Sequence, residues 1–163
     1  MFADLNEKVA LITGGGQGLG LGIVLKMAEQ GADIAIADLS DENLRQAADQ
    51  VEGMGRKVYT VNMDVTDKDS VTAGVNKLTD QAGQIDILVN NAGVAGAPGS
   101  TGTSFRDVDW DFTWKVNVKG LVDVTEAVLP QMRQRKAGKI INISSVAAKA
   151  AKYITANYAT TKM

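Results

Sequence analysis

Short β-branched segments alternate with longer segments of helical period along this sequence, and this alternation limits the fold more than any other feature. The expected strands are almost uniformly apolar, which is typical of parallel strands covered by helices on both faces. We therefore predict one domain over residues 1–163, an α/β fold with a doubly wound parallel sheet between two layers of helices. The expected strands are residues 8–13, 33–38, 57–62, 86–90 and 139–144.

The expected helices lie between these strands. In the first helix, Leu19, Ile23 and Met27 are spaced to form one apolar face. Residues 91–104 are rich in Gly, Ser, Thr and Pro, so we expect a functional loop there rather than a domain linker. A last helix begins shortly before the final residue. The four other expected helices are residues 18–30, about 40–54, about 66–83 and about 108–135.

The composition excludes several kinds of chemistry. The chain contains no Cys and no His. It therefore has no disulfide, no thiolate nucleophile and no catalytic triad that depends on histidine, and the usual zinc ligand sets are missing. We predict no metal site. An acid or base that acts near neutral pH must then be a carboxylate, a lysine or a tyrosine.

Charge and hydropathy limit the partners. The net charge is -2 and the lysines and arginines are scattered, which argues against a nucleic-acid partner. No apolar run approaches the roughly 18 to 20 residues that span a bilayer. The N-terminus MFADLNEK is polar and acidic, where a signal peptide would be basic and then apolar. We therefore predict a cytoplasmic protein that does not associate with membranes.

The segment TGGGQGLG, residues 13–20, joins the first expected strand to the first expected helix. Glycines let the backbone turn sharply and approach a ligand, and the N–H groups at the start of the helix attract a phosphate. The spacing of Gly14, Gly18 and Gly20 fits neither G-x-G-x-x-G nor a P-loop. The segment is either an anion site, which we favour, or only a tight turn.

Asp38 closes the second expected strand, about twenty residues after the glycine segment. A carboxylate at this place can accept hydrogen bonds from the ribose hydroxyls of an adenosine and repel a 2'-phosphate. Neither Gly15, Gly16 nor Leu39 supplies the positive charge that a 2'-phosphate needs. Asp38 could instead begin a turn or cap the next helix. On balance these residues favour NAD over NADP.

Several motifs follow one another in order. TGGGQGLG fits T-G-x-x-x-G-x-G, Asp64 and Val65 follow the third expected strand, and NNAG at residues 90–93 ends the fourth. In this order they resemble the short-chain dehydrogenases/reductases, from Lys8 to the last residue. The resemblance implies a Rossmann-like fold that binds NAD. It assigns the contacts with NAD to Gly14, Gln17, Gly18, Leu19, Gly20, Asp38, Leu39, Asp64, Val65, Asn91, Ala92, Gly93, Tyr158 and Lys162.

The resemblance extends to four active-site residues. Ser145 lies thirteen residues before Tyr158, which begins the family's Y-x-x-x-K as YATTK, and Asn117 lies in KVNVKG. The resemblance implies that Tyr158 is the general acid/base and that Lys162, one helical turn away, favours its phenolate and binds the nicotinamide ribose. It also implies that Ser145 binds the substrate oxygen and that Asn117 helps hold a water in a proton relay. Each residue also has a purely structural alternative. Tyr158 could pack on an amphipathic helix and Ser145 could cap a turn. Asn117 could bridge a helix kink and Lys162 could be a solvated charge.

The chain departs from the family pattern in two respects. Residues 146–157 lack the glycine and proline common there and add Lys149 and Lys152, which are either solvated charges or favour an anionic substrate. Family members also continue through further strands and helices after the Y-x-x-x-K motif. We therefore expect this sequence to record part of a longer polypeptide, with residues 139–144 left as an exposed sheet edge.

Three functions are compatible with these residues. The first is an NAD-dependent oxidoreductase acting on a small secondary alcohol or ketone. A variant is a ketoreductase for thioester-linked acyl chains, against which Asp38 argues because biosynthetic reductions more often use NADPH. The third is an inactive nucleotide-binding fragment. The resemblance also implies a homo-oligomer, a tetramer or dimer, because in this family the helices carrying Asn117 and Tyr158 pack against a second subunit.

Overall fold

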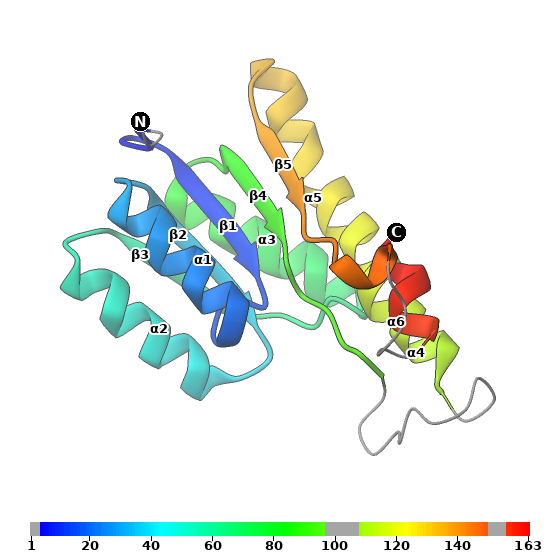
Figure 1. Ribbon diagram of the computed structural model, residues 1–163. Coiled ribbons are helices and arrows are strands. Elements are labelled where there is room, and N and C mark those ends of the chain that lie inside the picture. The colour runs from blue at the N-terminus through cyan, green and yellow to red at the C-terminus, as the bar shows by residue number, and fades with distance from the viewer. Residues whose placement is uncertain (1–3, 97–107, 150–155) are drawn as a thin grey trace.

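The computed structural model describes residues 4–96, 108–149 and 156–163. Five parallel strands form one sheet in the order β3-β2-β1-β4-β5, with helices on both faces (Figure 1). The predicted doubly wound α/β fold is therefore confirmed. The strands are β1 (Val9–Thr13), β2 (Asp33–Asp38), β3 (Val58–Asn62), β4 (Ile87–Asn90) and β5 (Lys139–Asn142).

Helices α1 (Gly18–Glu29) and α2 (Asp41–Gly53) cover one face of the sheet, and α3 (Lys68–Ala82) and α5 (Leu121–Arg135) cover the other (Figure 1). Each face has its own apolar core, because the strands direct alternate side chains to opposite sides. The remaining helical segments are α4 (Trp110–Trp114), the π-helical η1 (Lys115–Gly120), the 3-10 segment η2 (Val146–Ala148) and α6 (Ala156–Thr161).

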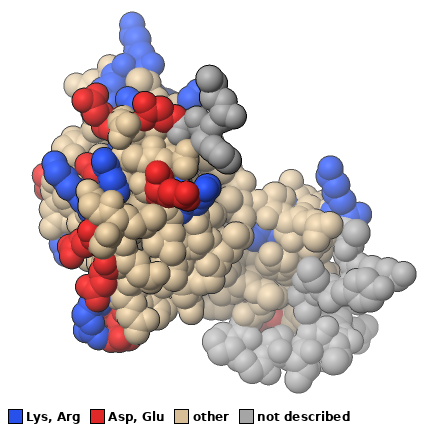
Figure 2. Space-filling model, turned by 60° about the vertical axis from the view of Figure 1, so that its left-hand side comes forward, with Lys and Arg blue, Asp and Glu red and all other residues tan. Residues whose placement is uncertain are grey.

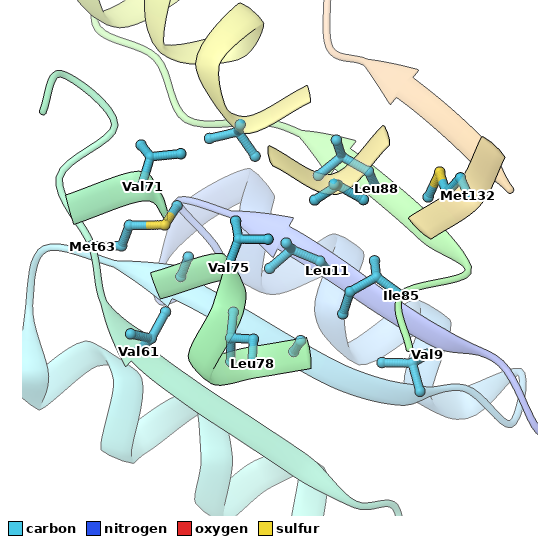
Figure 3. Packing of buried hydrophobic residues seen from close by; sticks show 14 residues of the cluster. Val9, Leu11, Val61, Met63, Val71, Val75, Leu78, Ile85, Leu88 and Met132 are labelled. Carbon is cyan, nitrogen blue, oxygen red and sulfur yellow. The ribbon is translucent and has the colours of Figure 1, made fainter. Parts of the chain in front are cut away.

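The core between the sheet and α3 and α5 illustrates this packing (Figure 3). Leu11 of β1 lies beside Val75 of α3 in this core, Leu88 of β4 lies beside α5, and all three residues are buried. Met132 closes this core from α5. Burial of apolar side chains on both faces is the main stabilising contribution to the central strands. This packing also holds in place the carboxyl ends of the strands, from which the connecting loops emerge.

The buried face of α1 agrees only in part with the predicted one. Ile23 and Met27 are half-buried against the core, as predicted, but Gly20, Val24 and Ala28 are the buried residues and Leu19 is 66% exposed. The reason is Gly20, since a Cβ at this position would overlap the carbonyl oxygen of Gly14. The helix backbone therefore packs directly against the glycine segment, and this contact sets the rotation of the whole helix.

The predicted helix over residues 108–135 is an uninterrupted series of three segments, α4, η1 and α5. Asp109 caps its start, because its carboxylate accepts a hydrogen bond of 2.8 Å from the N–H of Phe112. The middle turn is π-helical and contains Asn117. Single π turns inside α-helices often occur at functional sites, since the extra residue redirects the side chains.

The surface is mixed in charge. Figure 2 shows acidic and basic side chains interspersed over the face it presents. Strand β5 forms one edge of the sheet, and all four of its residues are exposed. Among the helices that the structure describes, none combines the length and the apolarity needed to cross a membrane.

Candidate active site

The carboxyl ends of the five parallel strands lie at the same end of the sheet. The neighbouring strands β1 and β4 are followed by helices on opposite faces, α1 after β1 and α5 after β4. Ligands of doubly wound sheets bind at this topological switch point. Two adjacent cavities of about 390 and 260 Å3 lie here and share Gly14, Gln17, Asp38 and Gly93. They are called the first and second cavity below, and together they form one groove.

The lining of the two cavities contains most of the residues predicted to bind or act. The first cavity adds Leu19, Gly20, Asn91, Ile143, Ser144, Ser145, Tyr158 and Lys162 to the shared residues. The second adds Leu39, Asp64, Val65 and Ala92, together with Ala37, Met63, Thr66, Val94, Phe112 and Val116. Of the predicted residues, Gly18 and Asn117 line neither cavity.

The glycine segment turns sharply between β1 and α1. Gly14 and Gly18 have φ angles of 62° and 55°, in the left-handed region that favours glycine. A Cβ at Gly14 would also lie 3.1 Å from the Cα of Ala92. Among the described residues no side chain caps the start of α1, whose first turn reads Gly-Leu-Gly-Leu. Its N–H groups are therefore available to an anion.

Thr13 and Asn91 hold the glycine segment against the end of β4. The Thr13 hydroxyl accepts hydrogen bonds of 3.1 Å from the N–H groups of Asn91 and Ala92. The Asn91 amide donates to the carbonyl oxygens of Thr13 and Gly14, at 2.9 and 3.0 Å. Thr13 was not among the predicted site residues, although its place at the head of the glycine motif was a usable signal.

Asp38 is 9% exposed and lines both cavities. One carboxylate oxygen accepts a hydrogen bond of 3.0 Å from the N–H of Gly16, and the other accepts one of 3.2 Å from Ser40. The loops after β1 and β2 are thus joined through this carboxylate. Ser40 in turn caps α2 by accepting from the N–H of Asn43. Asp38 therefore begins a turn, which was the alternative to a ligand-binding role, and it also borders the groove.

Asp64 and Val65 follow β3 and lie at the far end of the second cavity. The Asp64 carboxylate accepts a hydrogen bond of 2.8 Å from the N–H of Thr66, which orders this turn. Apolar side chains make up much of the remaining wall, among them Phe112 and Val116 from the helix that contains Asn117. An apolar slot with a few polar groups suits a flat heterocycle.

Ser145 and Tyr158 line the opposite end of the groove, in the first cavity. The Ser145 hydroxyl accepts a hydrogen bond of 3.2 Å from the N–H of Ala147, so it caps η2. The Tyr158 side chain is half-buried on α6. Within residues 4–96, 108–149 and 156–163, its hydroxyl has no hydrogen-bond partner.

Lys162 is 9% exposed, which is unusual for a lysine. Its ammonium donates a hydrogen bond of 3.0 Å to the carbonyl oxygen of Ile143, and burial lowers the pKa of this side chain. The Ser144 hydroxyl donates to the carbonyl oxygen of Lys162. A Cβ at Gly93 would lie 3.1 Å from the Lys162 Nζ, so glycine keeps this space open.

Asn117 lies behind the groove wall and is 3% exposed. Its side-chain oxygen accepts from the N–H of Val94 at 2.8 Å, and its amide nitrogen donates to the Val94 carbonyl and to the Thr161 hydroxyl, both at 2.9 Å. The side chain therefore joins η1, the segment after β4 and α6. The predicted loop after β4 is described only as far as residue 96, and its remainder lies outside the described residues.

Other residues around the groove were not anticipated. Ser144 and Ile143 hold Lys162, and Thr161 holds Asn117. Lys149 is exposed and lines neither cavity, and Lys152 lies outside the described residues. A larger cavity of about 640 Å3 lies beside β5 and the end of α5. It contains none of the motif residues, so its size alone does not make it the functional site.

The sequence signature of the family described as short chain dehydrogenase matches residues 8–163. The chain is 39% identical over 142 residues to the 3-oxoacyl-[acyl-carrier-protein] reductase FabG of Thermotoga maritima, covering 87% of this chain and 57% of the relative. It is 44% identical over 145 residues to the oxidoreductase UcpA of Salmonella typhimurium, covering 89% and 54%.

A solved structure agrees with these relatives. NAD+-bound xylitol dehydrogenase superposes with a TM-score of 0.88 at 34% identity, covering 98% of this chain and 61% of the other. The chain thus spans just over half of the length of the relatives it matches. The signature, the relatives and the superposition agree with the order of motifs along the groove. The chain belongs to the short chain dehydrogenase family.

Proposed function

We propose that the protein is an NAD-dependent oxidoreductase that interconverts a secondary alcohol and a ketone. The observation that carries this proposal is that Ser145, Tyr158 and Lys162 line the same cavity as the glycine segment and Asp38. The Tyr158 hydroxyl, which can transfer a proton, therefore borders the space that the nicotinamide end of a bound dinucleotide would occupy. When bound, the nicotinamide supplies or accepts the hydride.

The groove residues fit a dinucleotide. The start of α1 offers N–H groups to a pyrophosphate, and the apolar slot beside Asp64 and Val65 suits an adenine. At the other end, Gly93 leaves open the space beside the Lys162 ammonium, where a ribose could accept its hydrogen bonds. We assign the cofactor contacts to the residues predicted from the sequence on this basis.

The choice of NAD over NADP rests on Asp38. Its carboxylate is held by the N–H groups of Gly16 and Ser40, so it cannot readily turn away from a 2'-phosphate. The described lining of the second cavity contains no Lys or Arg that would attract such a phosphate. A fixed negative charge against a phosphate is unfavourable, whereas it accepts hydrogen bonds from free ribose hydroxyls.

The proton chemistry is assigned to four side chains. In the oxidation direction, the Tyr158 phenolate would accept the hydroxyl proton of the alcohol, and a nicotinamide bound beside it would supply the hydride acceptor. The positive charge of Lys162 favours the phenolate, and its effect is larger because little water screens it at 9% exposure. The Ser145 hydroxyl donates to the substrate oxygen, and Asn117 positions the segment at Val94 and contributes to the proton relay.

The experiment is to mix the purified protein with secondary alcohols and either NAD or NADP, and to record absorbance at the reduced-nicotinamide band together with the intact mass. We expect turnover with NAD exceeding that with NADP by at least about tenfold, a difference of about 1.4 kcal/mol. Replacing Tyr158→Phe removes the hydroxyl and should lower kcat by a factor of about 100 or more.

The matched control is Tyr59→Phe, on β3 and outside both cavities, which should keep the parent kcat. Undiminished turnover by Tyr158→Phe would contradict the assigned role. If no alcohol or ketone reacts with either cofactor, the oxidoreductase proposal fails and a nucleotide-binding role without catalysis takes its place.

Reduction of a 3-oxoacyl thioester is the second candidate. The relative from Thermotoga maritima carries the name of such a reductase, at 39% identity. A 3-oxoacyl thioester assayed with NADH and NADPH distinguishes the two candidates. Higher kcat/KM for the thioester than for simple ketones would favour the second.

We also propose that the protein acts as a homo-oligomer in the cytoplasm. Trp114 and Val122 lie on the α4–α5 helix and are 44% and 45% exposed, and large exposed apolar side chains on one helix support association.

A further inference from the structure

Two hydrogen bonds, one buried and one partly buried, connect the helix of α4 and η1 to α6. The Asn157 amide donates to the Thr113 hydroxyl at 2.8 Å, and the Asn117 amide donates to the Thr161 hydroxyl at 2.9 Å. Thr113 and Asn157 are both 0% exposed, and Asn117 is 3% exposed. These four residues are called the two Asn–Thr pairs below.

The two pairs repeat one arrangement. Thr113 and Asn117 are four residues apart on one helix, and Asn157 and Thr161 are four residues apart on the other. In each pair the Asn donates to the Thr, and the Thr hydroxyl donates to a main-chain carbonyl three or four residues earlier, that of Asp109 or Tyr158. Since residues four apart share one helical face, the pairs join two faces of parallel helices in a single register.

Tyr158, the proposed general acid/base, and Lys162, the proposed ribose ligand, each directly follow a residue of an Asn–Thr pair. Tyr158 follows Asn157, and Lys162 follows Thr161. A residue one position along a helix is rotated by about 100°, so it faces the groove when its neighbour faces α4 and η1. The Asn157 side-chain oxygen also accepts from the N–H of Tyr158, and its amide nitrogen also donates to the carbonyl oxygen of Asp109. Together with the bond to Thr113, the oxygen and both N–H groups of this amide have partners.

Sliding or rotating α6 would break both pairs at once. Each break would leave at least one buried polar group without its partner, because Thr113 and Asn157 are 0% exposed and Asn117 is 3% exposed. Apolar packing alone would not hold this register, since it is not directional.

We propose that the two Asn–Thr pairs fix the register of α6 against α4 and η1, and that Thr113 and Asn157 are positioning residues for Tyr158 and Lys162. Thr113 lines neither cavity and so acts only through α6. The kinetic readout of this inference rests on the proposed function, whereas its structural readout does not.

The kinetic test replaces Thr113→Val, which keeps the shape and removes the hydroxyl. We expect kcat to fall at least tenfold and the pH at which kcat is half-maximal to shift, because the Tyr158 hydroxyl leaves its position. Thr113→Ser restores the hydroxyl and should recover kcat to within about threefold. The control Thr160→Val changes an exposed threonine on the same helix and should leave both quantities unchanged.

A loss of thermal stability in Thr113→Val with unchanged kcat and pH profile would overturn the inference, because the pair would then only stabilise the fold. Should Thr113→Val not fold, Thr161→Val tests the second pair with the same expected changes. Unchanged kinetics there would overturn the inference equally.

The structural test uses the absence of native cysteines. Spin labels on Asp111→Cys and Thr160→Cys, both exposed positions, report the separation of α4 and α6 by electron paramagnetic resonance. We expect one narrow distance distribution in the parent and in Thr113→Ser, and a shifted or broadened one in Thr113→Val. Identical distributions would overturn the inference whether or not the protein is active. A shift in a protein that oxidises no alcohol would uphold it and remove the proposed function alone.

Discussion

Strands β1 and β5 both contain apolar β-branched residues but have opposite surroundings. All five residues of β1 are buried between helices and neighbouring strands, whereas all four residues of β5 are exposed at the sheet edge. Ile12 is 0% exposed and Ile141 is 44% exposed, although both belong to β-branched runs of the same parallel sheet. The burial of a strand is therefore decided by the elements that cover it, and its own residues only permit that burial.

The two regions are also held by different interactions. Around β1 and β2 the contacts are mainly apolar, between the sheet and α1 and α2. Around α6 the contacts that orient Tyr158 and Lys162 are hydrogen bonds, from Lys162 to the carbonyl of Ile143 and within each of the two Asn–Thr pairs. Apolar packing contributes most of the stability, and directional hydrogen bonds place the side chains of the candidate site.

The largest expected difference between the regions is in core stability. Replacing Ile36→Ala in β2 deletes a side chain that is 0% exposed, and should lower the free energy of unfolding by about 2 to 5 kcal/mol. The matched change Ile141→Ala in β5 should cost less than about 1 kcal/mol. Urea unfolding monitored by circular dichroism measures both.

Equal losses for the two variants would contradict this comparison. They would mean that β5 is covered in solution, for example by a second copy of the chain. Sedimentation of the parent protein at several concentrations would then show association, and Ile141→Ala would weaken it.

A smaller difference is expected between two glycines of α1. Gly20 packs against Gly14, and an added Cβ would lie 2.6 Å from the Asn91 amide nitrogen, whereas a Cβ at Gly22 meets nothing within 4 Å. Gly20→Ala should destabilise the protein by about 1 to 3 kcal/mol. Gly22→Ala should stabilise it by up to about 1 kcal/mol, because alanine favours the helix.

Thermal unfolding of the two variants side by side gives the measurement. If Gly20→Ala were as stable as the parent, α1 would not be in direct backbone contact with the glycine segment. The explanation given above for the rotation of the helix would then be wrong.

The sequence predicted the elements well where one physical rule dominated. The central strands were predictable because strands buried on both faces require continuous apolar runs, as in β2, whose bounds agree with the prediction at both ends. The rotation of α1 was not, because the helix carries apolar residues on most of its circumference. Its orientation depends on the contact of Gly20 with Gly14, which no periodicity reveals.

The candidate site was predictable in its motifs but not in its supports. The spacing of Tyr158 and Lys162 follows from helix geometry, so their common side of α6 could be expected. The partners of Asn117 lie 23 and 44 residues away in the chain, and those of Asn157 up to 48. Such hydrogen bonds arise only when distant elements meet, so a single sequence does not indicate them.

The smallest expected effect concerns the charge of Lys162. Burial lowers the pKa of this lysine from its usual 10.5 in the folded protein, so between the two pKa values the unfolded chain binds more protons than the folded one. This group therefore makes the free energy of unfolding increase as the pH rises through that interval. Below the interval both states are protonated, and the full cost of burying the ammonium is present.

Replacing Lys162→Met removes this dependence. Urea unfolding from about pH 7 up to 10.5 should show the parent gaining stability relative to Lys162→Met, while the exposed control Lys77→Met should follow the parent across the range. A constant difference between the parent and Lys162→Met would mean that the ammonium is as well solvated in the folded protein as in the unfolded chain. Water would then screen it beside Tyr158, and burial would not strengthen its effect on the Tyr158 phenolate.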